Sequence, residues 1–308
     1  MLEHITVLKE EAVEQLNIKP EGIYVDMTLG GGGHSSLILS KLTSGHLYSF
    51  DQDDYAIARA KERLDKVSNN YTIIKSNFKY IKSKLAELGV EHVDGVLYDL
   101  GVSSFQFDDE TRGFSYRMDA ELDMRMDRSQ EFSAKTIVNE WSVSELINIF
   151  YKYGEEKFSK QIAYKIDEAR RVKPINTTFE LVDIIKSALP AKVLNQKGHP
   201  AKKIFQALRV AVNDELRVFE YSLNDALEML NKGGRCVVIT FQSLEDKICK
   251  HTFKEVSTLN IPAGLPIQTS NMKAPFTLIT RNAIVPSDNE IENNNRSHSA
   301  KMRVIEKN

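Results

Sequence analysis

The chain contains little cysteine, and its cysteines are not spaced to hold a metal or to form a disulfide scaffold. There are two, Cys236 and Cys249, in 308 residues. We expect both to be small, buried apolar side chains in a reducing compartment. His-Glu-x-x-His, Cys-x-x-Cys and Gly-x-Ser-x-Gly patterns are also missing from the sequence, so it predicts neither a metal site nor a serine hydrolase.

Long apolar runs and an excess of one charge are absent as well. No segment approaches the roughly 18 apolar residues of a membrane span, and the N-terminus lacks the pattern of a signal peptide. We therefore expect a cytoplasmic protein without a membrane partner. Lys and Arg total 41 and Asp and Glu total 43, so any nucleic-acid site must be a local patch.

The first third of the chain alternates between short apolar runs and amphipathic segments. The runs predict strands at residues 22–27, 46–50, 71–75 and 93–98, and the amphipathic segments predict helices at residues 35–41, 55–67 and 81–88. This alternation indicates right-handed βαβ units, and hence a parallel sheet of the α/β class. A further strand at 233–241 continues the sheet, followed by late strands at 276–280 and 300–306. The Asn-rich residues 287–299 between them predict a flexible loop.

The middle of the chain interrupts this alternation. Helical signals dominate there, at residues 143–151, 156–171, 178–188 and 201–230. We interpret residues 107–230 as a helical insertion in an α/β domain that comprises residues 1–106 and 231–308. From Lys157 to Arg209 the insertion carries twelve basic residues against four acids, although the whole chain has a net charge of −2. This concentration of positive charge in one segment favours contact with RNA phosphates. The alternative is a helical face that is exposed to solvent and binds no RNA.

A glycine run follows the first predicted strand. Gly30, Gly31, Gly32 and Gly33 stand between that strand and a predicted helix, where glycine allows a sharp turn and the close approach of a ligand. Asp51 ends the next strand, about twenty residues further on, where an acid can accept hydrogen bonds from ribose hydroxyls. Together they predict a site for a nucleoside-containing cofactor.

The glycine spacing bears on which cofactor binds. A dinucleotide fingerprint requires a third glycine three residues after the second, and Ser35 or Ser36 stands there instead. S-adenosylmethionine has no pyrophosphate and does not need the complete fingerprint. The spacing therefore favours S-adenosylmethionine over a nicotinamide dinucleotide without excluding the latter.

Other residues are expected at the same edge of the sheet. Asp99 ends the fourth strand, and the carboxyl ends of parallel strands line the ligand crevice of an open α/β sheet. Phe78 follows the third strand and could flank an adenine ring, although a core position is the alternative. Gln106 and His34 are further candidates at this edge. The alternative for Gln106 is a surface amide without a ligand, and the alternative for His34 is a structural histidine. The sequence assigns no catalytic residue.

Several longer segments, taken together, resemble one known family. The matching residues are 4–8, 26–35 (DMTLGGGGHS), 99–104 (DLGVSS), 112–116 (RGFSY), 122–127 (LDMRMD), 199–216 (HPAKKIFQALRVAVNDEL), 243–246 (SLED) and 295–304 (NRSHSAKMRV). In this order they resemble the bacterial 16S ribosomal RNA (cytosine-N4)-methyltransferases, the MraW-like family. They extend over nearly the whole chain, which makes the combination far more specific than a glycine turn.

The resemblance implies a class I, Rossmann-like methyltransferase sheet with an inserted helical substrate-recognition domain. It implies S-adenosylmethionine as methyl donor and N4-methylation of a cytidine in the decoding region of 16S rRNA, within the small ribosomal subunit. By motif position, the residues implied to contact the cofactor are Gly32, Gly33, His34, Asp51, Phe78, Asp99 and Gln106. The oligomeric state stays open, with a homodimer among the alternatives.

The chain departs from the family pattern at a few positions. Phe105 replaces a usual proline, Ala120 and Glu121 replace Gly-Pro, and Gln242 stands where histidine is usual. The change at Gln242 argues against an obligatory histidine base at that position. Two other functions remain: a non-catalytic RNA-binding or ribosome-assembly factor, and an NAD-dependent dehydrogenase on the same type of sheet.

Overall fold

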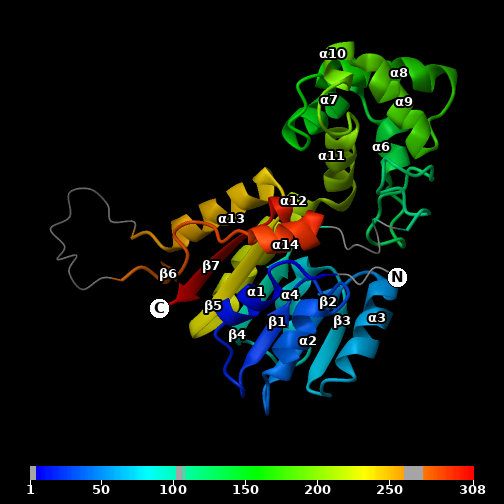
Figure 1. The fold of residues 1–308 in the computed structure, drawn as a ribbon. Coiled ribbons are helices and arrows are strands. Elements are labelled where there is room, and N and C mark those ends of the chain that lie inside the picture. The colour runs from blue at the N-terminus through cyan, green and yellow to red at the C-terminus, as the bar shows by residue number, and fades with distance from the viewer. Residues whose placement is uncertain (1–4, 102–106, 108, 260–272) are drawn as a thin grey trace. The chain divides into compact units, whose positions relative to one another are not determined.

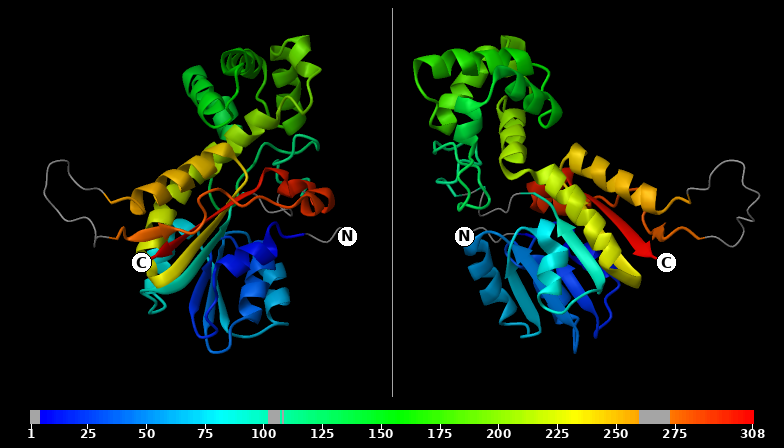
Figure 2. Two further views of the ribbon diagram at one scale, coloured as in Figure 1. Left: turned by 60° about the vertical axis from the view of Figure 1, so that its left-hand side comes forward. Right: turned by 180° about the vertical axis from the view of Figure 1, so that it is seen from behind.

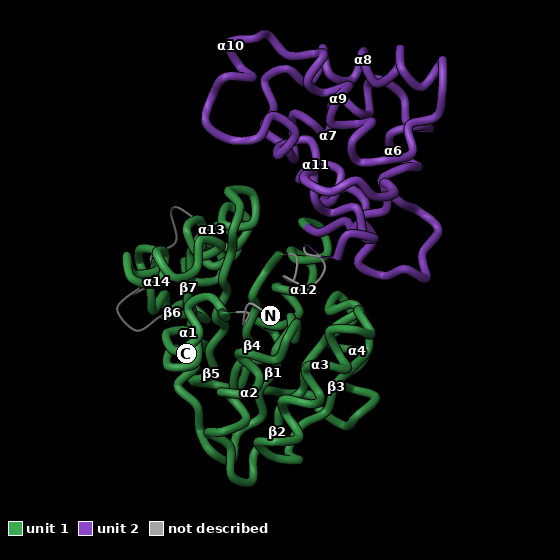
Figure 3. The backbone as a smooth tube through the Cα atoms, turned by 45° about the vertical axis from the view of Figure 1, so that its right-hand side comes forward, with its two compact units in different colours: residues 1–101, 216–308 green, residues 102–215 purple. Residues whose placement is uncertain are grey.

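The chain forms two compact units in a computed structural model that describes residues 5–101, 107, 109–259 and 273–308. Unit 1 comprises residues 1–101 and 216–308, and unit 2 comprises residues 102–215 (Figure 3). The boundaries expected from the sequence, 106/107 and 230/231, differ from these. The larger difference arises because helix α12 (Glu215–Met229) groups almost entirely with unit 1.

Unit 1 is built around a seven-stranded sheet with the order β3-β2-β1-β4-β5-β7-β6 (Figure 1). The strands are β1 (Ile23–Asp26), β2 (His46–Asp51), β3 (Tyr71–Lys75), β4 (Val93–Asp99), β5 (Leu230–Thr240), β6 (Phe276–Leu278) and β7 (Lys301–Lys307). Strands β1 to β5 pair in parallel, whereas β7 is antiparallel to both β5 and β6. The chain order reverses between β1 and β4, which is the point where α/β sheets bind ligands.

Helices cover both faces of this sheet (Figure 2). One apolar core includes α1 (Lys9–Gln15), α2 (Gly33–Ser40) and α3 (Asp54–Leu64), and the other includes α4 (Ile81–Ala86), α12 and α13 (Ser243–Val256). Successive strand residues alternate between the two cores, because side chains on a strand point to opposite faces. Leu97 and Val237 belong to the first core, and Tyr98 and Val238 belong to the second.

Helix α12 belongs to the sheet because its apolar face packs there. The single helix expected over residues 201–230 is divided in the structure, where Asp214, with a φ of 52°, separates α11 (Lys202–Asn213) from α12. Phe219 and Leu223 of α12 are buried in the second core. The Tyr98 hydroxyl and Ser222 Oγ, both buried, form a 2.7 Å hydrogen bond.

Unit 2 is helical and has its own apolar core. Its helices within the described residues include α6 (Ala134–Glu140), α7 (Val143–Lys152), α8 (Ser159–Val172), α9 (Thr178–Ala188), α10 (Ala191–Leu194) and α11. Capping boxes begin α7 and α9, where Ser142 pairs with Glu145 and Thr177 with Glu180. The predicted helices at 143–151 and 178–188 are confirmed.

The predicted flexible loop at residues 287–299 is wrong. The segment forms α14 (Asp288–Asn293) and the short helix η3 (Asn295–Ser299). Ser287 Oγ caps α14 by accepting the N–H of Glu290, and Glu290 Oε1 accepts the N–H of Leu8 at 2.8 Å. The cap and this long-range bond order a segment whose polar composition resembled that of a loop.

Candidate functional site

The glycine turn connects β1 to α2, and two of its glycines are needed for its backbone. Gly30 has a φ of 48° and Gly32, the N-cap of α2, has a φ of 73°, values that other residues rarely adopt. Gly33 is required for a different reason. A Cβ there would lie 1.8 Å from Thr6 Oγ1, so the side-chain position of Gly33 is taken by the N-terminal segment.

Asp26, at the end of β1, holds both ends of this turn. Its Oδ1 accepts the N–H of Thr28 at 3.0 Å and its Oδ2 accepts the hydroxyl of Ser35 at 2.6 Å. Ser35 Oγ also lies 2.9 Å from Ser49 Oγ on β2. Burial raises the pKa of Asp26. No role for Asp26 is predicted from the sequence, although an acid at the end of an apolar strand is the available signal.

Asp51 lies directly beside the glycine turn. Its Oδ2 accepts the N–H of Gly30 at 2.9 Å, and its Oδ1 accepts the N–H groups of Gln52 at 2.7 Å and Asp53 at 2.9 Å. Burial nevertheless raises the pKa of Asp51 to about 6. The structure therefore brings together the carboxyl group and the glycines that the sequence predicted to share one edge of the sheet.

Asp99 ends β4 on the other side of β1. The N–H of Asp99 donates to Thr28 Oγ1 at 2.7 Å, and its Oδ2 lies 3.5 Å from His34 Nδ1. Its Oδ1 is buried and has no hydrogen-bond partner among the described residues. Burial, followed by the charges of Asp26 and Glu245, raises the pKa of Asp99 to about 8. A partly exposed carboxyl group with one buried, unsatisfied oxygen suits a ligand that brings a cation or a donor.

Phe78 lies at the carboxyl end of β3, in the short helix η1 (Phe78–Tyr80). Its half-buried ring packs edge-on against Tyr98 with centroids 5.9 Å apart. The ring thus packs against the core, as the alternative interpretation expected. Binding of adenine by Phe78 stays a prediction. Gln106, together with Phe105, lies outside the described residues.

The SLED segment fixes the turn after β5. Glu245 Oε2 accepts the N–H groups of Phe241 at 3.0 Å and Gln242 at 3.2 Å, and Glu245 Oε1 accepts Gln242 Nε2 at 2.7 Å. Asp246 Oδ1 accepts the Arg303 Nε of β7 at 2.6 Å. The segment thereby places Gln242 at the carboxyl end of β5, and the Glu245 carboxylate is close enough to act on Asp99.

The twelve basic residues between Lys157 and Arg209 of unit 2 fall into two groups. Five of the twelve are ion-paired with acids: Lys165 with Glu168, Arg170 and Arg171 with Asp167, Lys173 with Glu180, and Arg209 with Glu215. The other seven form no ion pair with any described residue, and all are exposed: Lys157, Lys160, Lys186, Lys192, Lys197, Lys202 and Lys203. We call these seven the unpaired lysines. Their positive charge is not neutralised locally.

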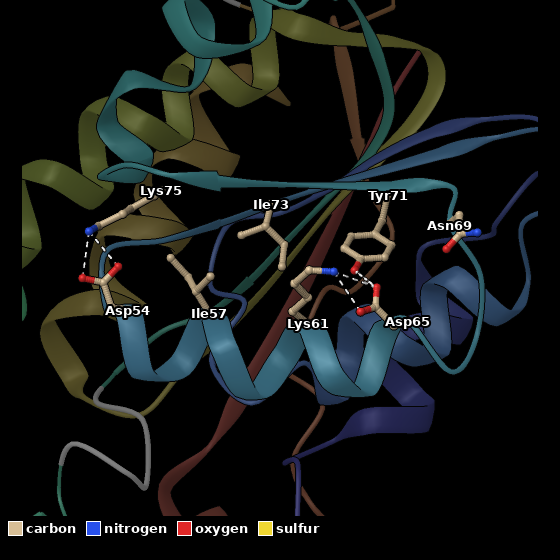
Figure 4. A pocket seen from close by; sticks show the side chains of 8 residues that line it. All are labelled: Asp54, Ile57, Lys61, Asp65, Asn69, Tyr71, Ile73 and Lys75. Atoms are coloured by element: carbon tan, nitrogen blue, oxygen red, sulfur yellow. Dashed lines mark hydrogen bonds and ion pairs between the residues drawn. The ribbon is translucent and has the colours of Figure 1, made fainter.

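A hollow of about 490 Å³ lies elsewhere on unit 1, between α3 and β3 (Figure 4). Its lining residues are Asp54, Ile57, Lys61, Asp65, Asn69, Tyr71, Ile73 and Lys75. The charged groups are already paired with each other, Lys75 with Asp54 and Lys61 with Asp65. The hollow contains none of the predicted site residues, so it is not the predicted cofactor site.

Within the described ranges, no group of three His, Cys, Asp or Glu side chains could hold a metal ion. The same part of the chain has no helix with the length and apolar character needed to cross a membrane. Cys236 and Cys249 are buried free thiols, as predicted, and burial raises the pKa of both.

The strand order, the antiparallel β7 and the glycine turn after β1 define a class I methyltransferase fold. The chain belongs to the MraW methylase family, which matches residues 1–308. It is 55% identical over 308 residues to ribosomal RNA small subunit methyltransferase H of Exiguobacterium sibiricum, covering 100% of this chain and 99% of that protein.

Solved structures of low sequence identity are also similar to the chain. An rRNA methylase from Streptococcus thermophilus is 11% identical with a TM-score of 0.43, covering 100% of this chain and 98% of its own. A protein from Streptococcus mutans, solved in complex with SAH, is 13% identical with a TM-score of 0.46, covering 99% and 100%. The family assignment rests on the full-length sequence matches.

Family membership confirms the predicted class, a methyltransferase that uses S-adenosylmethionine, and the predicted α/β sheet. It also removes the NAD-dependent dehydrogenase from the alternatives. The roles of the individual site residues and of unit 2 remain predictions.

Proposed function

We propose that this chain transfers the methyl group of S-adenosylmethionine to N4 of a cytidine in the decoding region of 16S rRNA. One observation carries the proposal. In a methylase-family chain, the carboxyl groups of Asp51 and Asp99 lie at the switch point of the sheet beside the glycine turn. The rRNA substrate is supported by the full-length relative, whose name gives the small-subunit rRNA as its substrate.

The described residues fit the methyl donor. Asp51 would accept hydrogen bonds from the ribose hydroxyls, since its carboxyl group lies at the end of β2 beside Gly30. Asp99 would bind the ammonium of the methionine part, because its Oδ1 is buried without a partner among the described residues. The segment Gly32–His34 begins α2 close by, and Phe78 would contact the adenine. Gln106 joins this set by motif position.

The main task of the protein in this reaction is to position the target amine against the methyl donor. The bound donor supplies an electrophilic methyl group, whereas the lone pair of the cytosine amine is delocalised into the ring. The protein must therefore hold the amine nitrogen in line with the methyl carbon. Hydrogen-bond acceptors at the carboxyl ends of β4 and β5 would hold the amine N–H groups while positive charge develops on nitrogen. Gln242, fixed there by Glu245, is such a residue.

Unit 2 is the proposed RNA-recognition unit. The unpaired lysines carry local positive charge, within residues 157–209, that can attract phosphates without reading the base sequence. The target base must also leave its stack to reach a methyl donor, which costs a few kcal/mol in a duplex and less in a loop. An rRNA substrate within the small ribosomal subunit implies that the chain acts in the cytoplasm.

Methyl transfer can be measured directly. The purified chain is incubated with labelled S-adenosylmethionine and small ribosomal subunits from cells that lack the protein, and the rRNA nucleosides are analysed by mass spectrometry. We expect label in N4-methylcytidine from the decoding region. Transfer to another nucleoside would contradict the cytosine-N4 assignment. No transfer to subunits or to free rRNA would instead favour the non-catalytic RNA-binding factor.

A further inference from the structure

Two aromatic rings stack on each other in unit 2, from segments far apart in the sequence. Tyr116 lies in the segment that precedes α6, and His199 lies between α10 and α11. Their centroids are 4.3 Å apart and their planes are inclined by 13°. Both side chains are partly exposed. Neither residue has a role in the proposed methyl transfer.

The ring of Tyr116 is held in place by the core of unit 2. It packs edge-on against Phe205 of α11, with centroids 5.8 Å apart and an interplanar angle of 88°, and Phe205 is buried. The segment after Tyr116 is fixed by Thr178 of α9, whose Oγ1 donates to Met118 O and accepts the N–H of Ala120. The tyrosine ring is therefore oriented before any ligand arrives.

The imidazole of His199 is oriented as well. Its Nδ1 accepts the N–H of Ala201 at 3.2 Å, so this nitrogen carries no proton and any ring N–H is on Nε2. Burial, followed by the charges of Lys186 and Arg117, lowers the pKa of His199. The ring is thus neutral at neutral pH and presents a flat face similar to that of an aromatic side chain.

Two cations from different segments of the chain lie near the stacked rings. The Arg117 guanidinium carbon lies 5.9 Å from the centroid of the Tyr116 ring, and Arg117 is exposed. Lys186, one of the unpaired lysines, lies on α9 close enough to act on His199. Neither cation forms an ion pair with a described residue, so both remain available to anionic groups.

We infer that Tyr116 and His199 form a stacking platform for an unpaired base of the RNA, with Arg117 and Lys186 binding the phosphates beside that base. Every base has a flat face, so stacking on such rings tolerates many RNA sequences. Cations beside the rings bind the phosphates of the RNA backbone. An apolar protein partner would not use the two cations. This inference rests on the proposed RNA substrate and adds the place where an unpaired nucleotide is held.

Binding measurements with the full chain test the platform. The probes are a single-stranded RNA from the decoding region and a fully paired duplex of equal length, and affinities are measured by fluorescence anisotropy. We expect Tyr116→Leu to weaken binding of the single strand roughly 5- to 100-fold and to affect the duplex much less. Tyr116→Phe keeps the ring and should retain wild-type affinity. The matched control is Tyr151→Leu, at a tyrosine of unit 2 that is 71% exposed on α7.

Photo-crosslinking separates direct contact from a structural role, in case Tyr116→Leu disturbs the core around Phe205. RNA containing 4-thiouridine at unpaired positions is crosslinked to the wild-type chain, and the modified peptides are identified by mass spectrometry. Crosslinks to the peptides around Tyr116 or His199 support the platform. Crosslinks confined to other peptides overturn the platform but leave the RNA substrate in place. A wild-type chain that binds neither RNA nor small subunits would overturn the proposed function itself.

Discussion

The backbone N–H of Gly30 donates a 2.9 Å hydrogen bond to Asp51 Oδ2. This bond joins the turn after β1 to the end of β2, which are the two parts of the chain expected to hold an adenosine. The same carboxyl group accepts two more backbone N–H groups, so its position is fixed by the fold. Asp51 is therefore in place before a cofactor binds.

Replacing Asp51 should weaken binding of the methyl donor. We expect Asp51→Ala to raise the Kd for S-adenosylmethionine at least 10-fold, because hydrogen bonds to a charged acceptor contribute roughly 1.5–3 kcal/mol each. Isothermal titration calorimetry measures this Kd, and circular dichroism checks the fold. The matched control is Asp54→Ala, an exposed acid in the first turn of α3. Equal affinities for wild type and Asp51→Ala would contradict the ribose assignment.

Protonation of Asp99 should make stability depend on pH in the absence of the donor. Burial raises its pKa to about 8, so between about pH 4 and 8 the folded state holds a proton that the unfolded chain has lost. The free energy of unfolding therefore falls as pH rises through this range.

The range from about pH 6 to 8 lies above the titration of Asp51, at about 6, and comparison with Asp99→Asn separates the contribution of Asp99 from those of other groups. We expect a loss approaching ~1 kcal/mol per pH unit there, measured by denaturant unfolding, and a flatter profile for Asp99→Asn. Identical slopes in both proteins would show that Asp99 does not hold this proton. Saturating S-adenosylmethionine should also flatten the wild-type profile if its ammonium pairs with Asp99.

The close contact between Gly33 and Thr6 predicts a compensating pair of substitutions. Gly33→Ala would bring a Cβ within 1.8 Å of Thr6 Oγ1 and 2.9 Å of Thr6 Cβ, so we expect a loss of ~1–3 kcal/mol in the free energy of unfolding. Adding Thr6→Ala removes Oγ1 and Cγ2 and should restore part of the loss. Thermal unfolding of the two single variants and the double variant gives the coupling, and additive effects would disprove the contact.

The unpaired lysines should set the salt dependence of RNA binding. We expect Lys202→Gln to lower the slope of log affinity against log salt by about 1. Lys165→Gln, whose lysine is already paired with Glu168, should change the slope much less. Lys203 is a poorer choice because its Nζ donates to the backbone oxygen of Glu155. Equal slopes for the two variants would mean that the unpaired lysines only face solvent.

Strong periodic signals allowed much of the fold to be predicted. Residues 71–75 and 178–188 form a strand and a helix with the predicted bounds. The break at Asp214 was missed, because an aspartate in a left-handed backbone gives a weaker local signal than a glycine. Helix α14 was missed because the segment is polar and the bond from Leu8 to Glu290 joins residues far apart in the chain, although Ser287 and Glu290 have the local spacing of a helix start.

The positions of site residues could be predicted where a predicted strand or turn ends at them. Strand ends placed Asp51 and Asp99 at one edge of the sheet. Sequence could not show that the side-chain position of Gly33 is occupied by Thr6, or that Asp26 joins both ends of the turn. Nor could it separate the unpaired lysines from those neutralised by acids, since that depends on which side chains meet in space.

The break in unit 1 between residues 101 and 216 has a consequence during protein synthesis. Strand β4 pairs with β1 on one side and with β5 on the other, but β5 begins only at Leu230. Until the ribosome has made that strand, one edge of β4 has no partner, and its buried apolar side chains lack the cover of α12. All residues of unit 2, whose core lies within residues 102–215, are synthesised before β5. The inserted unit can therefore fold before the last three strands of the surrounding sheet have been made.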